Sequence, residues 1–234
     1  MGSSPRLVLA VAVLLAPSAA VRAADVPALL AAVEANARFA RPALATGTLV
    51  WRHAGGEERM AVRLAGRRST LRIDAGDDRA LVRRGKALVR RGDAAPRLGV
   101  DATIGGSNVR FGDLAVLGPR LFRNPQIVDE GLAGTVVAAA PAGASSWVLL
   151  VVTIDPKRAL ATQVKYYEHA INNLVKRDRR SDFVEVDGTP RPARLATWDV
   201  QGDGTSEMEL AWRPAPELGW TPFTRAGLAT PLGP

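Results

Sequence analysis

The sequence predicts an α+β fold in which helical segments cover one antiparallel sheet. One amphipathic helix pattern follows an N-terminal leader, and most of the remaining chain alternates apolar and polar residues with a period of two. No regular alternation of helices and strands is present, which disfavours a parallel, nucleotide-binding sheet. With 47% hydrophobic and 23% charged residues, the 234-residue chain can build a packed core.

The leader, residues 1–23, is expected to be a secretory signal peptide. Arg6 gives a positive start, an apolar run covers residues 7–16, and Val21 and Ala23 supply the small residues that a signal peptidase requires. The run is too short to span a bilayer as a mature helix, and an uncleaved N-terminal anchor is the alternative. We expect cleavage after Ala23 and a single domain over 24–234 with a short proline-rich C-terminal tail.

A helix is expected directly after the leader. Apolar residues at positions 26, 29, 30, 33 and 37 share one stripe at the helical period. Asp25 is a good N-cap and Pro27 suits the first turn, whereas Pro42 is expected to stop the helix.

The strands that follow are expected to have one buried and one solvated face. A β-prone run at 46–52 leads through Gly55-Gly56 into a second strand, which forms a hairpin. In that second strand the apolar residues 60, 62 and 64 alternate with Arg59 and Arg63. Leu71 and Ile73 continue the pattern, and a tight turn at 85–86 joins two more strands.

The middle of the chain, 93–132, carries little strand signal and is expected to be a long loop with one or two short helices. Beyond it the strand pattern resumes. The segment 147–154 is apolar on both faces, so we expect it to be covered on both sides. Further strands are expected at 134–140, 164–167, 175–180, 183–186, 195–200 and 207–213.

The composition excludes several kinds of chemistry. The chain has no cysteine, which excludes disulfides, thiol catalysis, cysteine-ligated zinc and iron–sulfur clusters, and it has only two histidines, His53 and His169. Ser107 lacks the glycine pattern of a nucleophile elbow. The run 199–204 resembles the start of a calcium loop, but position twelve falls on Leu210, so a hairpin turn explains it better. We therefore expect no catalytic residues, no metal and no cofactor.

The formal net charge of +8 limits the kinds of partner that the chain is expected to bind. No long basic run and no aromatic-interleaved RNA motif is present, so nucleic acid is not an expected partner. For an exported protein, an anionic membrane surface fits this charge better.

Three stretches give the chain a family resemblance. They are a helix over 26–40 followed by a strand over 46–51; the motif Gly106-Ser107-Asn108 with Phe111, Asp113 and Leu114; and a strand that ends at Asp155-Pro156 before the run 163–168. In this order they resemble the LolA-like outer-membrane lipoprotein-sorting family over about residues 25–228. Three departures concern the ligand more than the fold: 89–98 lacks the family's aromatic residues, Asn108 replaces an acid, and 170–173 lacks a glycine.

The resemblance implies a strongly curved antiparallel sheet, an incomplete β-barrel whose concave face is covered by helices. It further implies a monomeric periplasmic carrier for lipoproteins or other acylated lipids, which sorts them towards the outer membrane and contacts inner-membrane export machinery. Alternatives are a periplasmic sensor or regulator of lipoproteins and a structural β-domain without catalysis. An enzyme is the class least supported.

One set of residues is expected to bind lipid, and a second set is expected to belong to a lid. The first set alternates with charged neighbours and is expected to form one apolar concave surface: Met60, Val62, Leu64, Leu71, Ile73, Val164, Tyr166, Met208, Leu210 and Trp212. The second set belongs to the segment 105–117, a lid over that surface whose family motif comprises Gly106, Ser107, Asn108, Phe111, Asp113 and Leu114.

Overall fold

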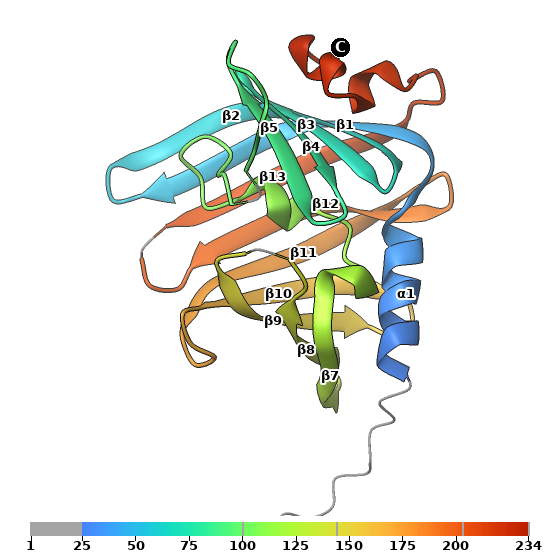
Figure 1. Cartoon of the computed structure of the whole chain (residues 1–234), viewed down its shortest axis with the longest axis vertical. Helices are drawn as coiled ribbons and strands as arrows, with labels where there is room; N and C mark the ends of the chain where they lie inside the picture. The colour runs from blue at the N-terminus through green and yellow to red at the C-terminus, as the bar shows by residue number, and fades with distance from the viewer. Residues whose placement is uncertain (1–24, 100, 144, 203, 234) are drawn as a thin grey trace, which may run out of the picture.

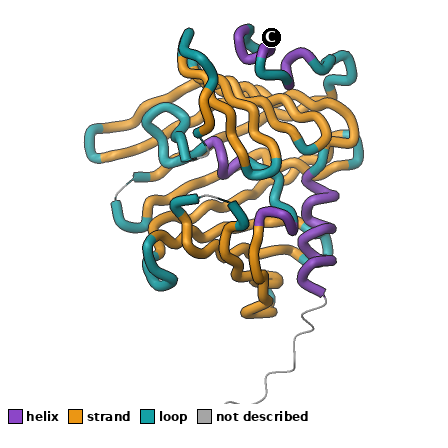
Figure 2. The backbone as a smooth tube through the Cα atoms, in the orientation of Figure 1, coloured by secondary structure: helices purple, strands orange, loops and turns teal. Residues whose placement is uncertain are grey.

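The computed structural model describes residues 25–99, 101–143, 145–202 and 204–233. The predicted signal peptide, its cleavage after Ala23 and the side chain of Asp25 lie outside the described part. Thirteen strands form one open antiparallel sheet in the order β6-β5-β4-β3-β2-β1-β13-β12-β11-β10-β9-β8-β7 (Figures 1 and 2). The fold is mostly β, with one α-helix in the described residues.

The first half of the chain builds the helix and one arm of the sheet. Helix α1 ends at Ala37, five residues before the predicted stop at Pro42. Pro42 lies instead within the first strand, where the register with the second strand shifts between Phe39 and Ala43. Such an irregularity accommodates a residue that has no N–H to donate. The bounds are α1 Asp25–Ala37, β1 Phe39–His53, β2 Gly56–Arg68, β3 Thr70–Ala75, β4 Asp78–Arg83, β5 Lys86–Arg91 and β6 Arg97–Leu98.

The second half builds the other arm and returns to the middle of the sheet, where β13 pairs with β1. Two short 3₁₀ helices, η1 and η2, confirm the short helices predicted in the middle segment. The bounds are η1 Phe111–Leu114, η2 Pro119–Leu121, β7 Phe122–Gly131, β8 Gly134–Pro141, β9 Trp147–Asp155, β10 Leu160–Glu168, β11 Leu174–Val186, β12 Thr189–Asp199, β13 Thr205–Pro214, η3 Thr221–Phe223 and η4 Ala226–Ala229.

Two strand predictions were wrong. Strand β7 occupies residues that were expected to be loop; it is an edge strand and mostly exposed, so its sequence carries no buried alternation. Strand β9 is not covered on both sides: Val148 is 38% exposed, and Leu149 and Val151 are only half-buried. A continuous apolar run in this strand therefore does not mean that both of its faces are buried.

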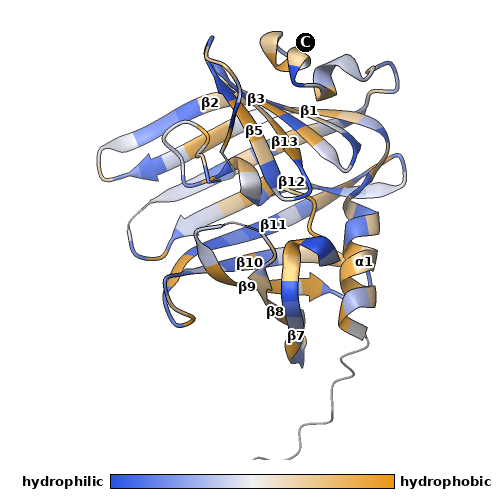
Figure 3. Ribbon diagram, viewed as in Figure 1, coloured by the Kyte–Doolittle hydropathy of each residue, from blue (hydrophilic) through white to orange (hydrophobic). Residues whose placement is uncertain are grey.

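Alternation divides the sheet into an inner face, which bears Leu64 and Ile73, and an outer face, which bears Ala65 and Arg72. The inner face supports two hydrophobic cores. The first lies over β1–β5 and β13 and includes the fully buried Phe111 of η1. The second joins α1 to β7–β10. Hydrophobic and hydrophilic residues interleave along α1 and the strands (Figure 3).

The C-terminal tail packs on the outer face rather than projecting into solvent. Phe223 and Leu232 are buried there with Leu44, Ala65 and Ala215. As a result all six residues of β3 are buried, which corrects the prediction of a solvated outer face for this strand. The same segment accepts a hydrogen bond from Arg63, whose Nη1 lies 2.8 Å from the Leu232 carbonyl oxygen.

Candidate functional site

The ten predicted apolar residues divide between the two cores. Val62, Leu64, Leu71, Ile73, Met208 and Leu210 are buried in the first core, and Met60 and Trp212 pack half-buried against it. Val164 and Tyr166 are buried in the second core. Cross-strand pairs such as Leu64 with Ile73 confirm the predicted alternation.

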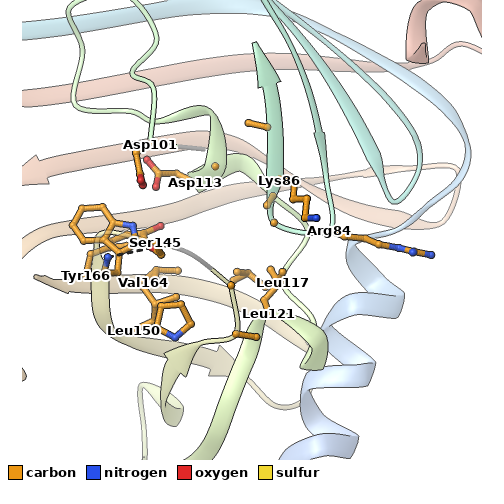
Figure 4. A pocket seen from close by; sticks show the side chains of 18 of the residues that line it. Arg84, Lys86, Asp101, Asp113, Leu117, Leu121, Ser145, Leu150, Val164 and Tyr166 are labelled. Carbon is orange, nitrogen blue, oxygen red and sulfur yellow. Dashed lines mark hydrogen bonds between the residues drawn. The ribbon is translucent and has the colours of Figure 1, made fainter. Parts of the chain in front are cut away.

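An open cavity of about 800 Å³ lies at the second core, where it meets the opposite arm of the sheet. The turn between β4 and β5 lines it on one side, and β9 and β10 line it on another, so the two arms of the sheet curve towards a common space (Figure 4). A cavity of this size is in the range of small-molecule binding sites.

Most of the cavity lining is apolar. Of the ten predicted apolar residues, only Val164 and Tyr166 line it. The other apolar lining residues come from the start of β5, from the middle segment and from β9, and the period-two alternation did not mark them. They include Ala87, Leu98, Ala115, Leu117, Leu121, Trp147 and Leu150.

The predicted lid segment crosses the inner face and is held there by both apolar and polar contacts. Phe111 is 0% exposed. The Ser107 hydroxyl donates to the Ile104 carbonyl oxygen at 2.7 Å, and the Asn108 N–H donates to the Ser206 hydroxyl of β13 at 2.9 Å. Leu114 packs half-buried against the first core. Gly106 lies against the Trp51 ring: a Cβ built at this glycine would be 3.2 Å from Trp51 Nε1.

A buried polar network lies beside the cavity. Tyr166, which lines it, donates its hydroxyl proton to Asp178 Oδ2 at 2.6 Å, and Thr197 donates to Asp178 Oδ1 at 3.0 Å. Lys176 pairs with Asp113 of the motif, and its Nζ lies 3.8 Å from Asp178 Oδ1. This pairing explains why an acid in the middle segment is buried at all.

Burial raises the pKa of two groups in this network. Burial raises the pKa of Asp178 to about 6, against the lowering effect of the Lys176 ammonium. Burial also raises the pKa of Tyr166 well above its usual value, and the nearby Asp178 charge adds to this effect. The phenol therefore stays protonated near neutral pH and acts as a hydrogen-bond donor.

The polar groups of the network satisfy one another, and neither histidine lines the cavity. The arrangement can therefore hold an apolar ligand beside a fixed polar wall.

No protein-family model matches the sequence, and no curated protein matches it. Several solved structures are similar to the structure of this chain. An outer membrane lipoprotein-sorting protein domain from Vibrio parahaemolyticus, described as putative, aligns with a TM-score of 0.66 at 16% identity, covering 85% of this chain and 95% of that one. A LolA superfamily protein from Nitrosomonas europaea aligns with a TM-score of 0.63 at 14% identity over 84% of this chain and 96% of that one. The chain has a LolA-like fold.

A DUF1329 family protein from Desulfovibrio piger shares the LolA-like fold, with a TM-score of 0.67 at 13% identity over 84% of this chain and 95% of that one. These likenesses confirm the resemblance that the motif residues predicted, at the level of the fold. In the part of the chain that the structure describes, no helix is long and apolar enough to cross a membrane.

Proposed function

We propose that this protein is a periplasmic carrier that binds lipoproteins or other acylated lipids and sorts them towards the outer membrane. The observation that carries the proposal is the open, largely apolar cavity of about 800 Å³ between the two arms of a LolA-like sheet. Two of the structural neighbours are described by their names as a lipoprotein-sorting domain and a LolA superfamily protein, which supports the same class of cargo.

Shielding an acyl chain from water needs no catalyst. Each methylene that leaves water contributes about 0.8 kcal/mol, so ten methylenes in the cavity contribute roughly 8 kcal/mol before the costs of association. A non-enzymatic binding role is therefore sufficient for this site.

In this proposal α1 and the segment 105–117 cover the concave face of the sheet and form its lid. The cavity already opens between this segment and the strands, with Ala115 and Leu117 of the segment on its wall. A longer chain enters only if the segment shifts, and the bonds from Asn108 and Asp113 oppose that shift.

Lipid content tests the proposal. The mature protein, exported in a bacterium with two membranes, is purified without detergent, extracted with organic solvent and examined by mass spectrometry. We expect acylated lipid at a substantial fraction of one equivalent, and displacement of a bound neutral fluorophore by added lipopeptide. A protein that carries no lipid and releases no fluorophore would contradict the carrier function.

A further inference from the structure

We propose that the cavity takes an amphiphile with an anionic head group, whose charge is bound at the cavity mouth by Arg84, Lys86 and Arg120. This inference rests on the proposed lipid-binding function and adds the chemical class of the head group. All three residues line the cavity and all three are exposed to solvent, so they lie where the cavity opens to solvent. Arg84 and Lys86 lie on the same side of it in Figure 4.

The three cations have no carboxylate within ion-pair distance among the described residues. The two acids that line the cavity, in contrast, are paired with other residues. Asp101 pairs with Arg110 at 3.2 Å, and Asp113 pairs with Lys176. The mouth therefore carries an uncompensated positive charge, although the cavity wall contains acids.

The local backbone fixes this arrangement. Arg84 and Gly85 form the turn between β4 and β5 with φ of 51° and 70°. Gly85 lies close to the side chain of Leu121, because a Cβ built at this glycine would be 2.5 Å from Leu121 Cδ2. This close approach brings the turn against η2, which carries Arg120, so that cations from two separate segments border one opening.

A second, smaller cavity of about 300 Å³ adjoins the first and shares Arg84, Arg120 and Leu121 with it. Glu34 and Arg38 of α1 line this smaller space as a pair. The two arginines therefore stand between an apolar cavity and a polar one. That position suits the junction between an acyl chain and a phosphate or carboxylate, to which guanidinium groups donate two hydrogen bonds at once.

Two lysolipids with the same acyl chain test the inference. Palmitoyl lysophosphatidylglycerol is anionic and palmitoyl lysophosphatidylcholine is zwitterionic, and each displaces a neutral fluorophore from the mature protein below its micelle concentration. Glycerol 3-phosphate supplies the anion without the chain. The variant R84Q/K86Q/R120Q is compared with R41Q/K157Q/R179Q, which removes the same charges at exposed positions outside the cavity.

We expect the wild type to bind the anionic lysolipid about tenfold more tightly, a difference that shrinks between ~50 mM and ~500 mM salt. The mouth variant should lose this preference while its affinity for the zwitterionic lysolipid stays unchanged, and the control variant should keep the preference. Equal affinity of the wild type for both lysolipids, or equal losses in both variants, would overturn the head-group assignment alone. Displacement by glycerol 3-phosphate alone would assign the cations to a free phosphate instead. No displacement by either lysolipid would overturn the proposed function together with this inference.

Discussion

Replacing Arg72 should release the C-terminal tail from the outer face of the sheet. Arg72 is 0% exposed and forms an ion pair with Asp74 on the same strand. Its Nη1 donates to the carbonyl oxygens of Pro222 at 3.1 Å and Gly227 at 2.9 Å, and its Nη2 donates to that of Thr230 at 2.9 Å. Asp74 in turn accepts the N–H of Leu232 at 2.7 Å. One side chain thus organises the backbone of the whole tail.

The expected cost follows from what Arg72→Leu leaves behind. Asp74 becomes a buried carboxylate without its counter-charge, and breaking such a pair typically costs about 3–5 kcal/mol. The double variant Arg72→Leu/Asp74→Leu removes both charges and should lose less, with a coupling free energy of about 2 kcal/mol. Arg79 also donates to tail carbonyls, at 3.0 Å to Ala229, but it is only half-buried, so Arg79→Leu should cost about 1 kcal/mol.

Urea unfolding followed by tryptophan fluorescence measures these free energies. Trp220 in the tail lies 4.3 Å from the Arg67 guanidinium and also reports local release. Limited proteolysis should remove the tail from the Arg72→Leu protein much faster than from the wild type. A loss below about 1 kcal/mol, or a tail that stays protected, would refute the role assigned to Arg72.

Four further outcomes follow from the sequence and the structure. Because the pKa of Asp178 is raised to about 6, the unfolding free energy should fall by on the order of 3 kcal/mol as pH rises from about 4 to about 6; Asp178→Asn should flatten that slope in urea titrations, and an unchanged slope would contradict it. Gly47→Ala should lower the urea midpoint strongly, because the added Cβ would lie 1.8 Å from the Glu209 carbonyl oxygen of β13. The control Gly143→Ala places its Cβ in open space and should keep the wild-type midpoint, so equal midpoints for the two variants would contradict this reasoning. Gly106→Ala should slow fluorophore exchange if the segment 105–117 moves as a lid, and unchanged kinetics would make it a fixed plug. N-terminal sequencing of the exported protein should begin at Ala24, and a start at Met1 would contradict cleavage after Ala23.

The sequence predicted the sheet well because period-two alternation reports one-sided burial. Strands β2, β10 and β13 bear their predicted inner-face residues for this reason. Strand β7 was not predicted, because an exposed edge strand needs no apolar face and its sequence shows no alternation. The alternation at Arg63 and Arg72 was equally clear, but it could not show that a tail more than a hundred residues away would cover these side chains.

The cavity was harder to predict than the sheet. Its wall depends on which turns and loops the curvature of the sheet brings together, and residues such as Ala87 and Leu121 have no local pattern that marks them. The motif residue Asp113 was found from the family resemblance, but its partner Lys176 became visible only in three dimensions.

Lipid occupancy in two neighbouring variants tests the central claim most directly. Leu150 lines the cavity, whereas Val151 is the next residue of β9, is also half-buried, and does not line it. Because a carboxylate in an apolar cavity opposes acyl chains, Leu150→Glu should carry at least about tenfold less co-purified lipid than the wild type, while Val151→Glu should keep it. Equal lipid in the two folded variants, measured by mass spectrometry after solvent extraction, would contradict binding in this cavity.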